Sequence, residues 1–103
     1  MKLVVRQSAA HALNKVSFSE NEGVRIEAIF VGSCSIYVDH YLWIDVKEEE
    51  DVLKTVEGIP FLISSESAKH LPHILYVDYN PTLGYKLSSD EETYKYNLRL
   101  TRR

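Results

Sequence analysis

Cys34 carries the most reactive side chain of this sequence and is its only cysteine. It follows Gly32 and Ser33 in a turn of small residues, where backbone N–H groups can lower the pKa of a thiol. A thiolate is a soft ligand that suits iron or an iron–sulfur cluster. The position also fits a small, partly buried side chain without a function. A single cysteine excludes an intramolecular disulfide and an all-thiolate metal site within one chain.

His40 is the second candidate metal ligand. It falls on the aliphatic face of a predicted strand, from which its ring could approach Cys34 across a hairpin. The alternative is a half-buried histidine that is satisfied by a hydrogen bond. His70 and His73 are spaced i, i+3, but Pro72 lies between them, so their rings need not share a helix face.

We considered nucleophilic catalysis by Cys34 and His40 as well. Such a thiol enzyme needs a third, orienting group, and the sequence does not identify one. The sequence also lacks a Gly-x-Ser-x-Gly motif and a glycine-rich loop that would bind phosphate. We therefore assign no catalytic residue and expect a protein that is not an enzyme.

An aromatic stripe with interleaved acids is another candidate surface. Tyr37, Tyr41 and Trp43 alternate with Asp39 and Asp45. The stripe either forms an exposed binding surface or packs in the core and in aromatic pairs. Single-stranded nucleic acid would need basic neighbours, and these neighbours are acidic.

The overall charge and hydropathy limit the partners. Twelve Lys and Arg against fifteen Asp and Glu give a net charge of −3, which offers no general attraction to nucleic acid or anionic lipid. No apolar run approaches the roughly 20 residues of a membrane helix. We expect a cytoplasmic protein that binds neither nucleic acid nor membrane.

The hydrophobic periodicity predicts short strands and two small helices, which is an α+β class dominated by β. With 103 residues, the chain has the length of a single domain. The acidic run 48–51 is interpreted as a solvated turn. We expect strands over 2–5, 24–31, 36–46, 52–56, 59–63, 75–79 and 83–87, helices over 7–16 and 64–71, and an edge strand or a loosely held end over 94–103.

The predicted core lies between two hairpin-rich sheets and beneath the first helix. We expect it to contain Val24, Ile26, Phe30, Val38, Leu42, Ile44, Phe61 and Leu87.

A series of short motifs follows the same order as in one known family. They are Leu3-Val4-Val5, Ser8-Ala9-Ala10-His11-Ala12-Leu13, Gly23-Val24-Arg25-Ile26, Gly32-Ser33-Cys34-Ser35, Asp51-Val52, Val56-Glu57-Gly58-Ile59-Pro60-Phe61-Leu62-Ile63, Ser65-Glu66-Ser67, Leu75-Tyr76-Val77-Asp78-Tyr79 and Gly84-Tyr85-Lys86-Leu87. On these residues the chain resembles the HesB/IscA-like family of A-type iron–sulfur carriers, the FeS cluster biogenesis domain. The resemblance implies one such domain over residues 1–103, with short mixed and antiparallel strands in a sandwich-like arrangement and two short helices.

The family's chemistry rests on three cysteines, one after the glycine-rich turn and two as Cys-Gly-Cys near the C-terminus. Cys34 matches the first position, whereas residues 92–97 contain no cysteine. The resemblance implies iron or an iron–sulfur cluster as the cofactor, bound through Cys34. It also implies a second copy of the chain, and iron–sulfur assembly or target proteins, as partners.

The missing cysteine pair leaves one thiolate per chain, too few for a tetrahedral metal. Bound iron should therefore bridge two chains through both copies of Cys34 or recruit a small thiol such as glutathione. We expect a diverged iron–sulfur biogenesis protein in which iron or cluster binding, through Cys34 and His40, is weak, transient or lost. The alternative is a non-catalytic interaction module that kept the scaffold.

Overall fold

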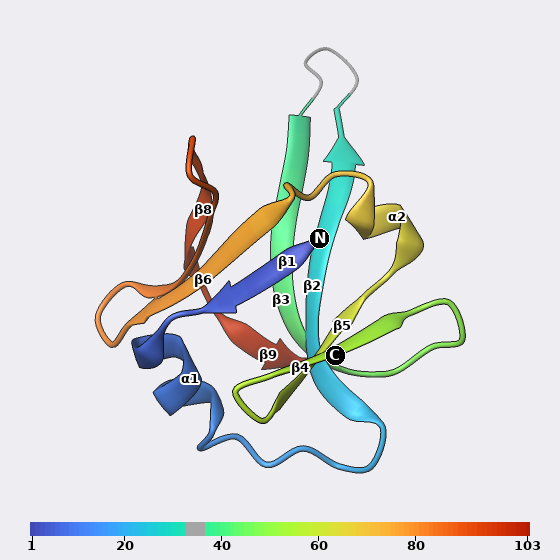
Figure 1. Ribbon diagram of the computed structural model, residues 1–103, viewed down its shortest axis with the longest axis vertical. Coiled ribbons are helices and arrows are strands. Elements are labelled where there is room, and N and C mark those ends of the chain that lie inside the picture. The colour runs from blue at the N-terminus through green and yellow to red at the C-terminus, as the bar shows by residue number, and fades with distance from the viewer. Residues whose placement is uncertain (33–36) are drawn as a thin grey trace.

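The computed structural model describes residues 1–32 and 37–103, which form nine strands and two short helices (Figure 1). In chain order these are β1 (Lys2–Val5), α1 (Gln7–Leu13), β2 (Glu22–Val31), β3 (Tyr37–Val46), β4 (Val52–Val56), β5 (Ile59–Ile63), α2 (Ser65–Ala68), β6 (Ile74–Asn80), β7 (Gly84–Ser88), β8 (Thr93–Leu98) and β9 (Leu100–Arg102). The predicted α+β class, dominated by β, is confirmed.

The strands form two mixed sheets. The four-stranded sheet has the order β1-β6-β7-β8, and the five-stranded sheet has the order β4-β5-β2-β3-β9. β1 runs parallel to β6, and β2 is antiparallel to β3 but parallel to β5. One hydrophobic cluster draws its buried side chains from both sheets and from α1. The sheets therefore pack on a shared core, which is the predicted sandwich-like arrangement.

The long β2–β3 hairpin fixes where its side chains point. Its register runs from Glu22 opposite Val46 to Val31 opposite Tyr37. The period of two buries Ile26 on the inner face, as predicted.

Phe30 was expected in the core, and this prediction is wrong. Its side chain is 57% exposed, and Val38, the residue opposite it, lies outside the core cluster. The upper end of the β2–β3 hairpin extends past the other elements in Figure 1. The apolar alternation of β2 thus continues past the end of the second sheet, and the inner face of β2 is left uncovered there.

Both helices are shorter than predicted. α1 buries Ala9 and Leu13 and packs against β6. After Leu13 the amides of Lys15 and Val16 bond to carbonyls only three residues back, which ends the α-helix in tighter turns. α2 is a single turn, capped by the Ser64 hydroxyl, which accepts a hydrogen bond from the Ser67 amide at 3.1 Å. None of the described helices is long and apolar enough to span a membrane.

The C-terminal segment forms edge strands, which decides between the two predictions made for it. β8 lies at the edge of one sheet and β9 at the edge of the other. The chain changes sheets at Arg99, between β8 and β9, and Asn97 near the end of β8 has a φ of 58°. Gly84 has a φ of 87°, and a Cβ atom there would lie 2.7 Å from the Leu98 carbonyl oxygen. A side chain at this position would therefore push β7 away from the crossing.

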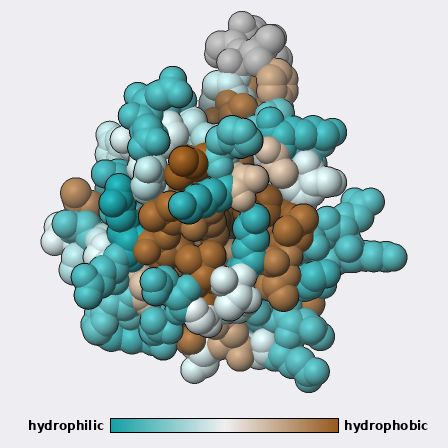
Figure 2. Space-filling model, viewed as in Figure 1, coloured by the Kyte–Doolittle hydropathy of each residue, from teal (hydrophilic) through white to brown (hydrophobic). Residues whose placement is uncertain are grey.

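Apolar side chains gather at the centre of one face of the molecule, over β1 and β4 (Figure 2). Val52 and Leu53 of β4 are 53% and 51% exposed. β1 and β4 are the outer strands of their sheets, and they contact each other across this face.

Candidate functional site

Of the two predicted site residues, the structure describes His40, which lies on the β3 arm of the β2–β3 hairpin. Cys34 lies outside the described residues, so its role as a ligand stays a prediction. His40 lies on β3, opposite Ala28 of β2, on the same face as the buried Leu42. His40 thus lies on the face of β3 that the sequence alternation predicted.

The His40 side chain is buried. The residue is 3% exposed, and neither ring nitrogen has a hydrogen-bond partner among residues 1–32 and 37–103. The ring of Tyr94, on β8, packs against it with a centroid distance of 5.2 Å and an interplanar angle of 33°. The described part of the chain thus supplies no hydrogen bond for this histidine.

Burial keeps this imidazole neutral. Desolvation lowers the pKa of His40, and this effect outweighs the attraction of the Asp39 carboxylate, which acts in the opposite direction. A neutral imidazole has a free lone pair and is the form that binds metal ions. A buried polar group without a partner costs stability, and such groups recur where a side chain has a task other than packing.

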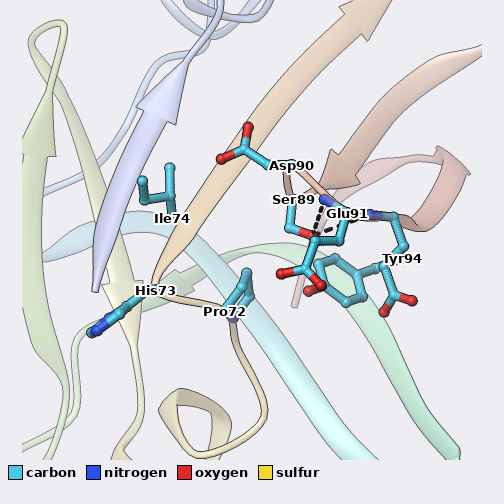
Figure 3. Close-up of a pocket in the computed structure, with 8 residues that line it drawn as sticks. Pro72, His73, Ile74, Ser89, Asp90, Glu91 and Tyr94 are labelled. Atoms are coloured by element: carbon cyan, nitrogen blue, oxygen red, sulfur yellow. Dashed lines mark hydrogen bonds between the residues drawn. The ribbon is translucent and has the colours of Figure 1, made fainter.

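Beside Tyr94 lies a cavity of about 290 Å³ (Figure 3). Pro72, His73 and Ile74 line one side, and the turn from Ser89 to Glu92 lines the other. The Ser89 hydroxyl oxygen accepts hydrogen bonds from the amides of Glu91 and Glu92, each at 3.2 Å, which shapes this turn.

The structure does not bring His70 and His73 together as ligands. His73 lines the small cavity, but its ring points away from the acidic turn in Figure 3. The His70 ring instead stacks on Phe30, with 6.2 Å between the ring centroids.

Over residues 1–32 and 37–103, no three His, Cys, Asp or Glu side chains form a group that could hold a metal ion. The described residues therefore do not replace the two cysteines that are missing from 92–97. His40 fits a metal ligand by its neutral, unpaired imidazole, but by itself it does not make a site.

The aromatic stripe lies on the outer face of β3 and is partly covered by C-terminal cations. Tyr41 and Trp43 stack with their centroids 5.7 Å apart. The Lys95 ammonium lies 4.9 Å from the centre of the Tyr41 ring, and the Arg103 guanidinium lies 5.0 Å from that of Trp43. Tyr37 alone stays largely open, at 55% exposed. The stripe is neither core nor a continuous open surface.

Asp39 organises the cations and hydroxyls of this outer face. It accepts hydrogen bonds from Lys95 Nζ at 2.6 Å and from the Tyr41 hydroxyl at 3.0 Å. The hydrogen bond from the Lys95 ammonium is the main reason why the pKa of Asp39 lies below its usual value. The same carboxylate also accepts the His40 amide at 2.8 Å, so it fixes the backbone at the candidate ligand.

The sequence matches no protein-family model and no curated protein. The fold matches a solved structure. It is similar to the crystal structure of a "putative Fe-S biosynthesis protein" from Lactobacillus acidophilus, with a TM-score of 0.66 and 17% sequence identity. The match covers 99% of this chain and 90% of the other. At this identity the likeness shows the fold, which is the fold that the sequence motifs implied.

Sequence reasoning missed a buried ion-pair cluster around Arg25. The residue is 5% exposed, and its guanidinium contacts both oxygens of Asp51, at 2.7 and 2.6 Å, and Asp45 Oδ2, at 2.7 Å. Asp51 was expected in a solvated turn, but it is 8% exposed. Its Oδ2 also accepts the Glu48 amide at 2.7 Å, so the last acid of the run is anchored to the sheet, while Glu48, Glu49 and Glu50 stay exposed as expected.

Proposed function

We propose that the protein is a diverged iron–sulfur biogenesis protein that binds iron or a cluster weakly and transiently. The observation that carries this proposal is the match of nearly the whole chain to the fold of the Lactobacillus acidophilus protein. The family motif that places Cys34 after a glycine-rich turn supports it.

The available donors explain why binding should be weak. Cys34 supplies one thiolate, and His40 supplies a neutral imidazole that has no competing hydrogen bond within the described residues. Iron–sulfur clusters are normally held by four protein ligands. Two ligands per chain leave the rest to a second copy of the chain or to a small thiol.

Anaerobic reconstitution with iron and sulfide tests the proposal. We expect substoichiometric iron that a chelator removes quickly, with visible absorbance that disappears in Cys34→Ser. His11→Ala is the matched control, because His11 is exposed on α1 and should leave the absorbance unchanged. Light scattering should show a dimer that depends on iron, unless glutathione is supplied.

A non-catalytic interaction module is the second candidate. The apolar surface over β1 and β4 favours it, because such exposed patches are typical of sites that contact other molecules (Figure 2). In that case the wild type should bind no more iron than Cys34→Ser. Changing the exposed β4 residue Leu53 to a polar one should then reduce the capture of a partner protein.

A further inference from the structure

A second and larger cavity lies between α1, the turn that joins β6 to β7, and the crossing from β8 to β9. Figure 1 shows α1 and the β6–β7 turn close together at the lower left of the molecule. The cavity volume is about 1030 Å³, which is just above the range of roughly 300–1,000 Å³ for small-molecule sites. His40 and the residues around it do not line this cavity.

The floor of the cavity is aromatic and aliphatic. Tyr79 and Tyr85 pack with their ring centroids 4.6 Å apart, and Ile44 and Leu98 extend the apolar surface. Tyr85 is 6% exposed. Burial raises its pKa to about 12, so its hydroxyl stays protonated at neutral pH.

Among the described residues no side-chain hydrogen bond involves the Tyr85 hydroxyl, whereas Tyr41 and Tyr76 donate their hydroxyls to carboxylates. Tyr85 therefore contributes to the cavity lining chiefly through its ring.

The rim of the cavity is positively charged. His11 comes from α1, Lys15 from the turn that follows α1, and Arg99 from the link between β8 and β9. The residues that line the cavity include no Asp or Glu. Lys15 and Arg99 form no ion pair within the described part of the chain, whereas Lys95, Arg102 and Arg103 do. In a protein of net charge −3, this rim is a local site of opposite sign.

We propose that this cavity binds a small amphiphilic carboxylate of the fatty-acid class. Its hydrocarbon body packs on the Tyr79–Tyr85 pair and Ile44, and its carboxylate meets Lys15 and Arg99 at the rim. The apolar floor supplies burial, and the unpaired cations select the charge of the head group.

A titration of ¹⁵N-labelled, iron-free protein with decanoate below its micelle concentration tests the proposal. We expect saturable binding of one decanoate per chain, with the largest amide shifts in α1, the β6–β7 turn and the β8–β9 link. Decanol, which lacks the charge, should bind about tenfold more weakly, and decyltrimethylammonium should not bind.

Charge reversal at the rim separates this site from unspecific apolar binding. The double variant Lys15→Glu/Arg99→Glu should weaken decanoate binding about tenfold while decanol binding stays unchanged. Lys2→Glu makes the same lysine-to-glutamate change on β1, outside the cavity lining, and should have no effect. Ala12→Phe, which fills the cavity, should abolish binding of decanoate and decanol alike.

Three results would overturn the proposal. The first is equal binding of decanoate and decanol with no response to the charge variants. The second is amide shifts confined to the apolar surface over β1 and β4. The third is binding to anionic phosphatidylglycerol vesicles without binding of monomeric decanoate, which would make the rim a membrane contact. Because the protein is free of iron, none of these results bears on the proposed iron chemistry.

Discussion

The guanidinium of Arg25 holds both carboxylate oxygens of Asp51 in a two-pronged ion pair, at 2.7 and 2.6 Å. The two residues are 26 positions apart, and both side chains are almost fully buried. Arg25 lies on β2, while Asp51 directly precedes β4. The pair therefore fastens the acidic loop and the outer strand β4 to the centre of the five-stranded sheet.

Asp51→Asn should destabilise the fold by about 3 kcal/mol, because it leaves a buried guanidinium with an incomplete set of charged partners. Urea unfolding measures this change. Glu49→Gln is the matched control, since Glu49 is exposed in the same acidic run and should change stability by no more than about 0.5 kcal/mol. Equal stabilities of the two variants would contradict the role given to the pair.

The same pair predicts how stability depends on pH. The hydrogen-bonded Arg25 guanidinium holds the pKa of Asp51 below its usual value. The stabilisation is therefore complete above the unfolded-state pKa of about 3.9 and is lost as the pH falls through the folded-state pKa. On acidification below about pH 5, the wild type should lose more free energy of unfolding than Asp51→Asn. If the free energy of unfolding fell equally with pH in both proteins, the Arg25–Asp51 pair would not be the cause of the pH dependence.

Phe61 and Phe30 are a matched pair of phenylalanines with opposite environments. Phe61 is 0% exposed in the core, and Phe30 is 57% exposed at the hairpin end. Phe61→Ala should destabilise by about 3 to 5 kcal/mol, because it leaves a cavity between the sheets. Phe30→Ala should cost less than about 1 kcal/mol in the same urea experiment. A similar loss for both variants would mean that the hairpin end is packed.

The alternation of apolar residues predicted most strands, the hairpin at Val56 and Ile59, and the inner face of β2. It could not locate where the opposite sheet ends, so Phe30 was assigned to the core. A period of two specifies which side chains share a face, but only the packed sheets decide which part of that face is covered.

The candidate site was predictable in part. The position of His40 on an apolar face followed from the strand pattern, whereas its contact with Tyr94 depends on a strand that lies far away in the sequence. Asp51 was assigned to a solvated turn because runs of acidic residues are usually exposed to solvent. Its partner Arg25 stands on another strand, and no local pattern links the two positions.

His40→Leu tests whether the buried imidazole is retained for a reason other than stability. Because no described residue hydrogen-bonds to either ring nitrogen, leucine at this site should raise the free energy of unfolding by about 1 kcal/mol. Thermal and urea unfolding of the iron-free protein would measure the gain. A loss of stability would show that the imidazole serves the packing around Tyr94.

Iron content after anaerobic reconstitution, compared between the wild type, Cys34→Ser and His40→Leu, tests the proposed function most directly. We expect the wild type to take up less than one iron per chain in a form that a chelator removes, and we expect both variants to take up less than the wild type. Retention of the wild-type iron content in Cys34→Ser would contradict the proposal, because the bound iron would then not depend on the thiolate.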